Sequence, residues 1–232
     1  MWPSALWHAP SVSKVRELRS APRRGYVVKF AWRSLRKRVS YQSTALGLRC
    51  DLRSDLPAPL ARAPLAVRPL GPAERELLRS EEGTDSPEDF YERMFRLRMF
   101  DAGIQTCYGA FGDDGGLMYV QWLIEPAQND LVHDFFEGMF PRLEPDEVLL
   151  EGAYTFPSAR GQGVMAAAMA AVTAEGKKRG FATAWTFVAE HNVPSLKGCR
   201  KAGYAEDIRR VEQWRLFRHS FSFGALAVPQ PT

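Results

Sequence analysis

The amino-acid sequence predicts a mixed α/β domain with a central sheet, preceded by a basic N-terminal extension. Residues 148–156 are mostly apolar, aromatic or β-branched, which is typical of a strand. They run into Arg160-Gly161-Gln162-Gly163, a short glycine-rich turn. The stretch 164–179 is rich in Ala and Met and ends in Lys and Arg before Gly180, which predicts a helix with a defined stop. Further strand and helix patterns alternate on both sides, which places the strands at the centre.

The other elements follow from apolar periodicity and from Gly, Pro, Ser and Asn at their ends. Helices are expected at 72–79, 86–100, 131–140 and 192–201, with Ser86 as the cap of the second. Strands are expected at 65–70, 106–111, 117–124, 182–188, 212–217 and 221–227. Residues 41–52 are predicted to form a strand that completes or flanks the sheet.

Charge divides the chain into two parts. Residues 1–60 hold 12 Lys/Arg against 3 Asp/Glu, whereas the remainder holds 19 against 24, for a net charge of +4. Prolines between 57 and 64 form a natural boundary. We therefore expect a basic extension at 1–60 and one folded domain at 61–232.

Within the extension, Val28, Trp32, Leu35 and Val39 recur at helical spacing beside several basic residues. A basic amphipathic segment can bind a membrane surface, a nucleic acid or an acidic carrier protein. The favoured interpretation is that its apolar stripe packs on the parent domain, or on a second copy in a homodimer. Membrane and nucleic-acid partners are accordingly disfavoured.

Composition excludes several classes of protein. No apolar run approaches the ~20 residues that span a bilayer, and no secretory signal is visible at the N-terminus, so a cytoplasmic location is expected. Cys50, Cys107 and Cys199 are scattered and form no C-x-x-C pair, so neither a disulfide framework nor a metal site is expected.

The strand, glycine turn and helix together predict an anion site. The first N–H groups of a helix have no internal partner, and the helix dipole adds partial positive charge there. Glycine lets the backbone approach an anion closely. The turn lacks the Walker pattern and the third glycine of a dinucleotide fingerprint, so a different pyrophosphate ligand is favoured.

Two motifs carry a family resemblance. The first is a strand, Pro157, and then Arg160-Gly161-Gln162-Gly163-Val164; the second is Asn192, Ser195, Cys199 and Gly203-Tyr204. In these motifs the chain resembles the GNAT superfamily of acyl-coenzyme A-dependent N-acyltransferases. The resemblance is good from about Leu65 to Tyr204, extends less closely to Phe223 and is absent from residues 1–60. It implies a mostly antiparallel central sheet flanked by helices, and acetyl-coenzyme A as the donor without a metal.

The resemblance also implies which residues hold the donor. Backbone groups of Thr155 and Phe156 would meet the pantetheine arm, as would Asn192 and Ser195, although Asn192 also suits a plain helix cap. The backbone amides of Arg160, Gly161, Gln162, Gly163 and Val164 would meet the pyrophosphate. The sequence departs from the family pattern at Ser158, where a polar Gln or Arg is usual, so one phosphate contact is in doubt.

Transfer of an acyl group to an amine needs a base, because amines are protonated at neutral pH. Glu151 sits where many family members carry an acidic residue used as base, and Glu147 is the alternative. Strand periodicity places both on one face with Ala153 and Thr155. A structural carboxylate with a partner remains the other interpretation of Glu151.

Cys199 takes the position that often carries a tyrosine general acid. It could protonate the leaving thiolate or simply fill the core.

The sequence therefore predicts an N-acetyltransferase that moves an acetyl group from acetyl-coenzyme A to a primary amine of a small molecule by direct attack. Three alternatives stay open: a longer-chain N-acyltransferase using acyl-coenzyme A or an acyl carrier protein, a non-catalytic acyl-coenzyme A-binding module, and nucleic-acid binding through residues 1–60.

Overall fold

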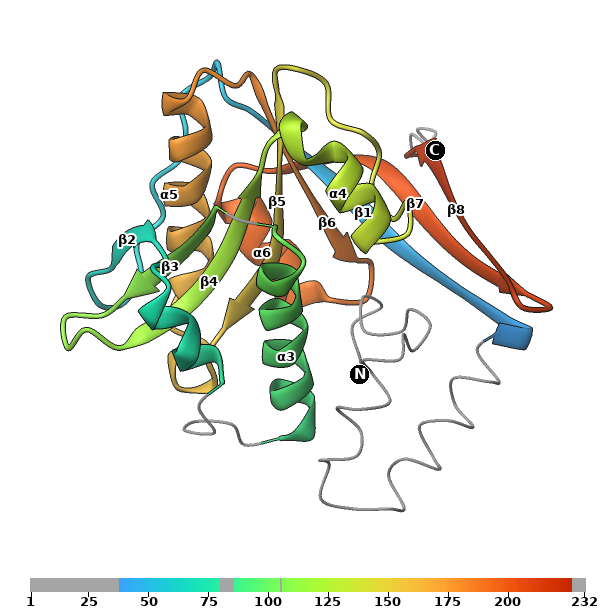
Figure 1. Ribbon diagram of the computed structural model, residues 1–232. Helices are drawn as coiled ribbons and strands as arrows, with labels where there is room; N and C mark the ends of the chain where they lie inside the picture. The colour runs from blue at the N-terminus through green and yellow to red at the C-terminus, as the bar shows by residue number, and fades with distance from the viewer. Residues whose placement is uncertain (1–37, 80–85, 105, 227–232) are drawn as a thin grey trace.

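The fold is built on one eight-stranded sheet, whose strands extend across Figure 1 from one edge of the sheet to the other. The computed structural model describes residues 38–79, 86–104 and 106–226. The strands are β1 (Ser40–Asp51), β2 (Ala66–Pro69), β3 (Cys107–Phe111), β4 (Leu117–Ile124), β5 (Glu147–Thr155), β6 (Thr183–Ala189), β7 (Ala205–Arg215) and β8 (Arg218–Ala225). Their order is β2-β3-β4-β5-β6-β1-β7-β8. Every neighbouring pair is antiparallel except β5 and β6, which confirms the predicted mixed, mostly antiparallel sheet.

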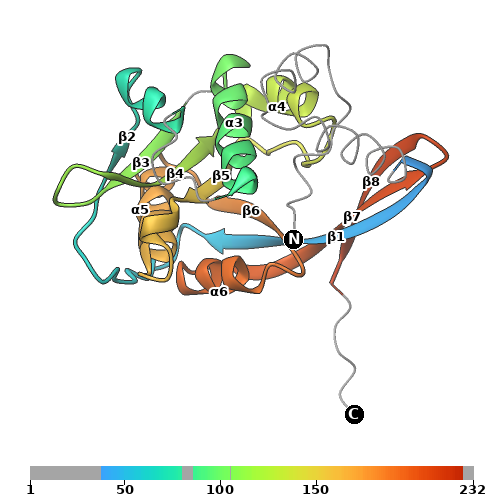
Figure 2. The ribbon, with the colours of Figure 1, turned by 90° about the horizontal axis from the view of Figure 1, so that it is seen from below.

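Helices cover both faces of the sheet, as Figure 2 shows. One face carries α3 (Pro87–Asp101) and α4 (Asn129–Phe135); the opposite face carries α5 (Val164–Lys178) and α6 (Val193–Lys201). Each face buries its own apolar cluster, with Trp122 and Phe136 on the α3 side and Leu48 and Met169 on the α5 side. The predicted cap of α3 is present, because the Ser86 hydroxyl accepts a hydrogen bond from the Asp89 amide at 3.1 Å.

Strand β1 is part of the sheet although it lies in the segment assigned to the basic extension. It is paired on both sides, from Ala45 to Asp51 with β6 and from Ser40 to Arg49 with β7. Leu48 is fully buried. The strand predicted at 41–52 therefore joins β6 to β7, while most of the amphipathic pattern at 28–39 lies outside the described residues.

Three elements differ from the prediction. The helix expected at 72–79 is a 3-10 helix, η2 (Ala73–Leu78), and α4 ends at Phe135, before Gly138 with φ of 76°. The strand expected at 212–217 begins at Ala205 instead. Its buried positions include Arg210 and Glu212, so hydrophobic periodicity does not reveal it.

A bulge in β5 positions the site. Val120 pairs with Tyr154 and Trp122 with Glu151, so two residues of β5 lie opposite one residue of β4. Gly152 at the bulge has φ of 69°, and a Cβ there would lie 2.8 Å from the Trp122 ring. The expectation that Ala153 shares a face with Glu151 is wrong, because the bulge moves Ala153 to the cluster packed under α5.

Among the described residues, no helix is both long and apolar enough to cross a membrane.

If β1 is integral to the domain, Leu48→Ala should destabilise the whole fold. Removing a fully buried leucine side chain leaves a cavity, and we expect a loss of about 2–5 kcal/mol in the free energy of unfolding. Urea denaturation measures it. The matched control is Arg49→Ala on the same strand: Arg49 is exposed and lies 3.9 Å from Asp207, so its loss should cost under about 1 kcal/mol. Equal effects of the two changes would contradict the structural role of β1.

Candidate active site

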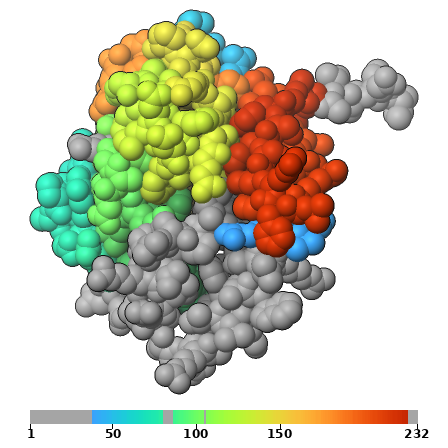
Figure 3. Space-filling view, turned by 45° about the vertical axis from the view of Figure 1, so that its right-hand side comes forward, coloured from blue at the N-terminus to red at the C-terminus, as the bar shows by residue number. Residues whose placement is uncertain are grey.

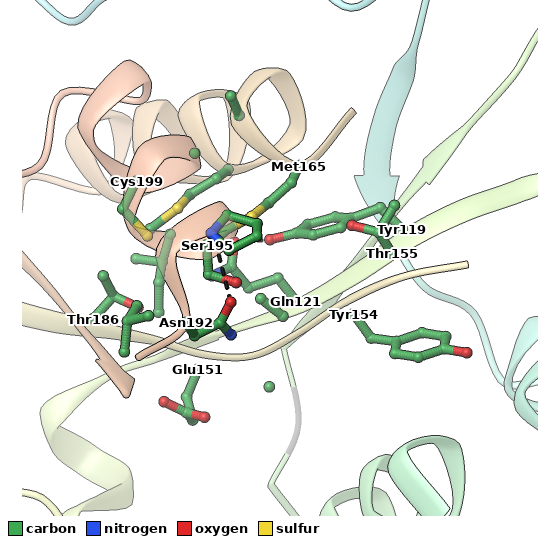
Figure 4. Close-up of a pocket in the computed structure, with 18 of the residues that line it drawn as sticks. Tyr119, Gln121, Glu151, Tyr154, Thr155, Met165, Thr186, Asn192, Ser195 and Cys199 are labelled. Atoms are coloured by element: carbon green, nitrogen blue, oxygen red, sulfur yellow. Dashed lines mark hydrogen bonds between the residues drawn. The ribbon is translucent and has the colours of Figure 1, made fainter. Parts of the chain in front are cut away.

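A cleft of about 850 Å³ opens where β5 and β6 separate. The two strands pair only from Glu147 to Leu149 with Thr183 to Trp185. Beyond that point the cleft is lined by β5, by α3 on one side, and by the starts of α5 and α6 on the other. Figure 4 shows Glu151 on one side of the strand that carries Tyr154, with Met165, Ser195 and Cys199 on the other.

The glycine turn forms one end of the cleft. Gly161 and Gly163 have φ of 74° and 80°, and Gly163 is the N-cap of α5. A Cβ at Gly161 would meet nothing within 4 Å, so the backbone is open to a ligand there. The Gln162 side chain closes the turn by donating to the Ser158 carbonyl at 2.8 Å, and Val164 is buried beneath it. The turn therefore leaves the backbone at Gly161 open, next to the start of α5.

Arg160 ties this turn to α3 through its side chain. Its guanidinium pairs with Asp89 and donates to the Thr155 carbonyl at 3.1 Å. Burial acts to raise the pKa of Asp89, but hydrogen bonds from Arg160, Ser86 and the Tyr154 hydroxyl outweigh it and lower the pKa. The Arg160 side chain is thus used within the protein, and its own amide bonds to the Pro157 carbonyl at 3.3 Å.

The middle of the cleft is the unpaired edge of β5. Beyond Leu149 no residue of β5 pairs with β6, which leaves backbone groups available from Leu150 to Thr155. Arg96 satisfies two carbonyls of the bulge, donating to Gly152 at 2.8 Å and to Ala153 at 2.7 Å. Thr155 lines the cleft, whereas Phe156 is buried and its amide donates to the Met118 carbonyl at 3.0 Å. The structure therefore brings Thr155 to the cleft and leaves Phe156 in the core.

Glu151 lies in the cleft on the α3 side. Burial raises the pKa of its carboxyl group, while the Gly152 amide, Arg210 and Arg96 act to lower it. Arg210 is itself buried, and loss of hydration lowers its pKa to about 10 although Glu151 and Glu212 favour its charge. Glu151 is thus a partly buried carboxyl group whose proton affinity is raised by burial and moderated by two guanidinium charges, which suits a group that exchanges protons.

Glu147 lies outside the cleft. One carboxylate oxygen accepts from the Trp185 indole at 2.9 Å and the other from the Glu144 amide at 3.0 Å. It belongs to the paired part of β5, opposite Thr183. The structure gives this alternative base two structural partners and no access to the cleft.

The second motif lines the other wall. The Asn192 side chain caps α6 by accepting from the Ser195 amide at 3.3 Å, and both residues line the cleft. Cys199 is 1% exposed, and burial raises the pKa of its thiol to about 12. Tyr204 is not available to the cleft, because its hydroxyl is buried against that of Thr173 at 2.8 Å.

Two cleft residues on β4 were not singled out from the sequence. The Tyr119 hydroxyl donates to the Gln121 side-chain carbonyl at 2.8 Å. The remaining Gln121 amide nitrogen is fully buried and has no hydrogen-bond partner, although it faces the cleft. An unpaired buried donor costs about 1–3 kcal/mol, which a ligand acceptor would offset. Both residues lie in a strand that is otherwise apolar. A polar Gln121 within residues 117–124 is the one feature of the sequence that could have indicated a functional residue there.

In the described part of the chain, no group of three or more His, Cys, Asp or Glu is placed to hold a metal ion.

The sheet thus opens between two parallel strands, with a glycine turn at the opening and the partly buried Glu151 carboxyl group beside it. The chain belongs to the GNAT family of acetyltransferases, whose sequence model matches residues 78–204. No sequence among the curated proteins matches it.

Solved structures share the fold at low identity. A GNAT-family acetyltransferase from Colwellia psychrerythraea is 14% identical, with a TM-score of 0.50, over 81% of this chain and 61% of that one. The GCN5-related glucosamine N-acetyltransferase region of a fungal multi-domain GH3 β-N-acetylglucosaminidase is 15% identical, with a TM-score of 0.52, over 80% of this chain and 22% of that one. The chain spans less than two thirds of the length of either structure.

The raised pKa of Glu151 has a consequence for stability. A carboxyl group whose pKa is higher in the folded than in the unfolded state stabilises the fold at low pH, and that contribution is lost as the pH rises through the folded pKa. Glu151→Gln should therefore raise the melting temperature at pH 8, and the gain should shrink as the pH falls toward the ordinary glutamate pKa of ~4.3. Calorimetry at several pH values measures this. A gain that does not vary with pH would show that ionisation of Glu151 is not its source.

Proposed function

We propose that the protein is an N-acetyltransferase that moves the acetyl group of acetyl-coenzyme A to a primary amine of a small molecule. The observation that carries this proposal is that one cleft contains the open glycine turn, the unpaired edge of β5 and the Glu151 carboxylate. The proposal includes a cytoplasmic location, which rests on the sequence alone.

The donor fits the α5 side of the cleft. Amides at the start of α5 would hold the pyrophosphate, because Gly161 has open space above it. Backbone groups on the unpaired edge of β5 up to Thr155, other than the carbonyls that Arg96 and Arg160 already bind, would bind the amides of the pantetheine arm as a further strand would. Asn192 and Ser195 would border that arm from α6, and the Gln121 amide would donate to a carbonyl oxygen of the donor.

The acceptor fits the α3 side. Glu92 lines the cleft, and one of its carboxylate oxygens has no hydrogen-bond partner while the other accepts from Arg96 at 2.5 Å. Phe95, Phe140 and Phe187 supply apolar walls. A cationic amine would be attracted to Glu92 and Glu151, and Glu151 would take the proton that the nitrogen must lose on attack. The carboxylate form is required, so kcat/KM should fall as the pH drops through the pKa of Glu151.

A thiolate leaves when the acyl group is transferred, and two groups that line the cleft are candidates to protonate it. Cys199 has the position that the resemblance implies, but a thiol with a pKa near 12 is a weak acid. Tyr119 lines the same wall, and burial raises its pKa well above the ordinary tyrosine value. Either group is fully protonated at neutral pH, so each can donate without first gaining a proton.

Gly161→Glu tests the donor site with an internal control. It places a carboxylate where the pyrophosphate would lie, and we expect the Kd for acetyl-coenzyme A to rise at least about 100-fold. Gly180→Glu is the matched control, because Gly180 has φ of 89°, has nothing within 4 Å of its Cβ position and lies beyond the far end of α5. Isothermal titration measures both. Equal weakening by the two changes would point to backbone strain rather than to a phosphate site.

Glu151→Gln separates an enzyme from a binding module. If Glu151 is the base, turnover with a panel of amines should fall at least about 100-fold while acetyl-coenzyme A still binds. Unchanged turnover would remove Glu151 from the mechanism. Turnover with octanoyl-coenzyme A or an acyl carrier protein, but not with acetyl-coenzyme A, would establish the longer-chain alternative.

A further inference from the structure

The hairpin of β7 and β8 carries an apolar pair that the fold does not use. Its two-residue loop is Leu216-Phe217, between the paired residues Arg215 and Arg218. Leu216 is 76% exposed and Phe217 is 59% exposed. Figures 1 and 2 show the hairpin projecting to one side, past the helices that cover the sheet. Two large apolar side chains therefore stand at the end of a protruding ribbon.

The loop backbone makes this choice of residues unusual. Leu216 and Phe217 have φ of 46° and 68°, in the left-handed region. Two-residue hairpin loops of this kind strongly favour Asn-Gly, because Asn and Gly adopt positive φ readily. Leu and Phe are strained there. These side chains are not buried in the hairpin, and its backbone would favour other residues. A contact with something outside the described residues best explains why Leu and Phe occur here.

Three arginines flank the apolar tip, although the Arg38 guanidinium lies over the Trp214 ring, 5.7 Å from its centroid. Arg215 and Arg218 are exposed on either side of it, and Arg38 lies beside it, because the Phe217 amide donates to the Arg38 carbonyl at 2.7 Å. Within the described part of the chain, none of these three guanidinium groups pairs with a carboxylate. The nearest acidic residue along β7 is Glu212, which is 2% exposed and faces Ser43 and Trp214.

Strand β1 begins at this same place, shortly after the basic N-terminal sequence. Residues 1–37 contain nine Lys/Arg and one acidic residue, and they precede Arg38 and Val39 directly. The Leu216 amide donates to the Val39 carbonyl at 3.0 Å, and Val39 is 45% exposed. Figure 3 shows the hairpin, in red, next to the start of β1, in blue, on one surface of the molecule. Positive charge and exposed apolar side chains thus meet at one edge of the protein.

We propose that this edge, made of Arg38, Val39, Arg215, Leu216, Phe217 and Arg218, docks on an anionic lipid bilayer. A convex apolar tip ringed by arginines matches the membrane interface, where apolar side chains enter the acyl boundary and cations meet anionic headgroups. A nucleic acid would match the charge but offers the leucine no apolar environment. The sequence alone disfavoured a membrane; the positions of Leu216 and Phe217 are the reason to expect one.

The double change Leu216→Asn with Phe217→Gly tests the proposal, because it replaces the tip with residues that suit the turn. The full chain should cosediment with vesicles containing about one quarter phosphatidylglycerol, at roughly 0.15 M salt, and bind pure phosphatidylcholine far less. The double variant should bind the anionic vesicles at least about tenfold more weakly while its melting temperature is unchanged or higher. Leu77→Asn, at a 42% exposed leucine in η2 near the opposite edge of the sheet, should bind as the unchanged protein does.

A labelled variant reports insertion directly. Cys50, Cys107 and Cys199 are buried, so Phe217→Cys can be labelled selectively with an environment-sensitive fluorophore. Its emission should shift to the blue on anionic vesicles, and that of labelled Leu77→Cys should not. The proposal is overturned if the double variant binds vesicles as tightly as the unchanged chain, or if the label at 217 shows no shift. It is also overturned if light scattering shows that the double variant only dissociates a dimer, since the tip would then contact a second copy.

Discussion

The early end of the β5–β6 pairing is the constraint on which the site depends. Parallel pairing stops at Leu149, and the bulge at Gly152 then turns the next residues of β5 away from the direction of a regular strand. The carbonyls that the bulge leaves without a strand partner are bound by Arg96, which is 6% exposed and reaches across from α3. A buried carbonyl without a partner would destabilise the fold by about 1–3 kcal/mol. The hydrogen bonds from Arg96 therefore offset the loss of strand pairing at the bulge. The cleft therefore depends on three features: the short pairing of β5 with β6, the bulge at Gly152, and the hydrogen bonds from Arg96.

The same arrangement sets the charge of Glu151. Burial favours the neutral form of this carboxyl group, whereas the Gly152 amide, Arg210 and Arg96 favour its ionised form. Arg96 thus has two roles, holding the bulge and moderating the proton affinity of Glu151. Burial also lowers the pKa of Arg210, so burial opposes the charged form of both groups. Such a site reduces stability in return for reactivity, which is a common property of groups that transfer protons.

Much of this could be predicted from the sequence, for identifiable reasons. The glycine turn and the start of α5 follow from residues that specify their own backbone, such as Gly161 and Gly163. The bulge could not be predicted, because Gly152 is equally compatible with a regular strand, and it invalidates the period of two beyond Glu151. Arg210 was missed because β7 buries Arg210 and Glu212 where an apolar pattern would expect leucine or valine. Arg96 was missed because its partners are backbone carbonyls more than fifty residues away.

Strand β1 also bears on the donor side of the cleft, through the segment that connects it to β2. This segment crosses the glycine turn: the Arg62 amide donates to the Gln162 carbonyl at 2.9 Å, and a Cβ on Gly163 would lie 3.1 Å from the Leu60 carbonyl oxygen. Gly163 therefore has two separate reasons to be glycine, its left-handed backbone and the close approach of residues 60 and 61. The approach fixes the turn from outside while Arg160 fixes it from α3. Because a ligand that binds backbone amides gains most when those amides are already held in place, the pairing of β1 with β6 and β7 supports the geometry of a turn to which β1 itself contributes no residue.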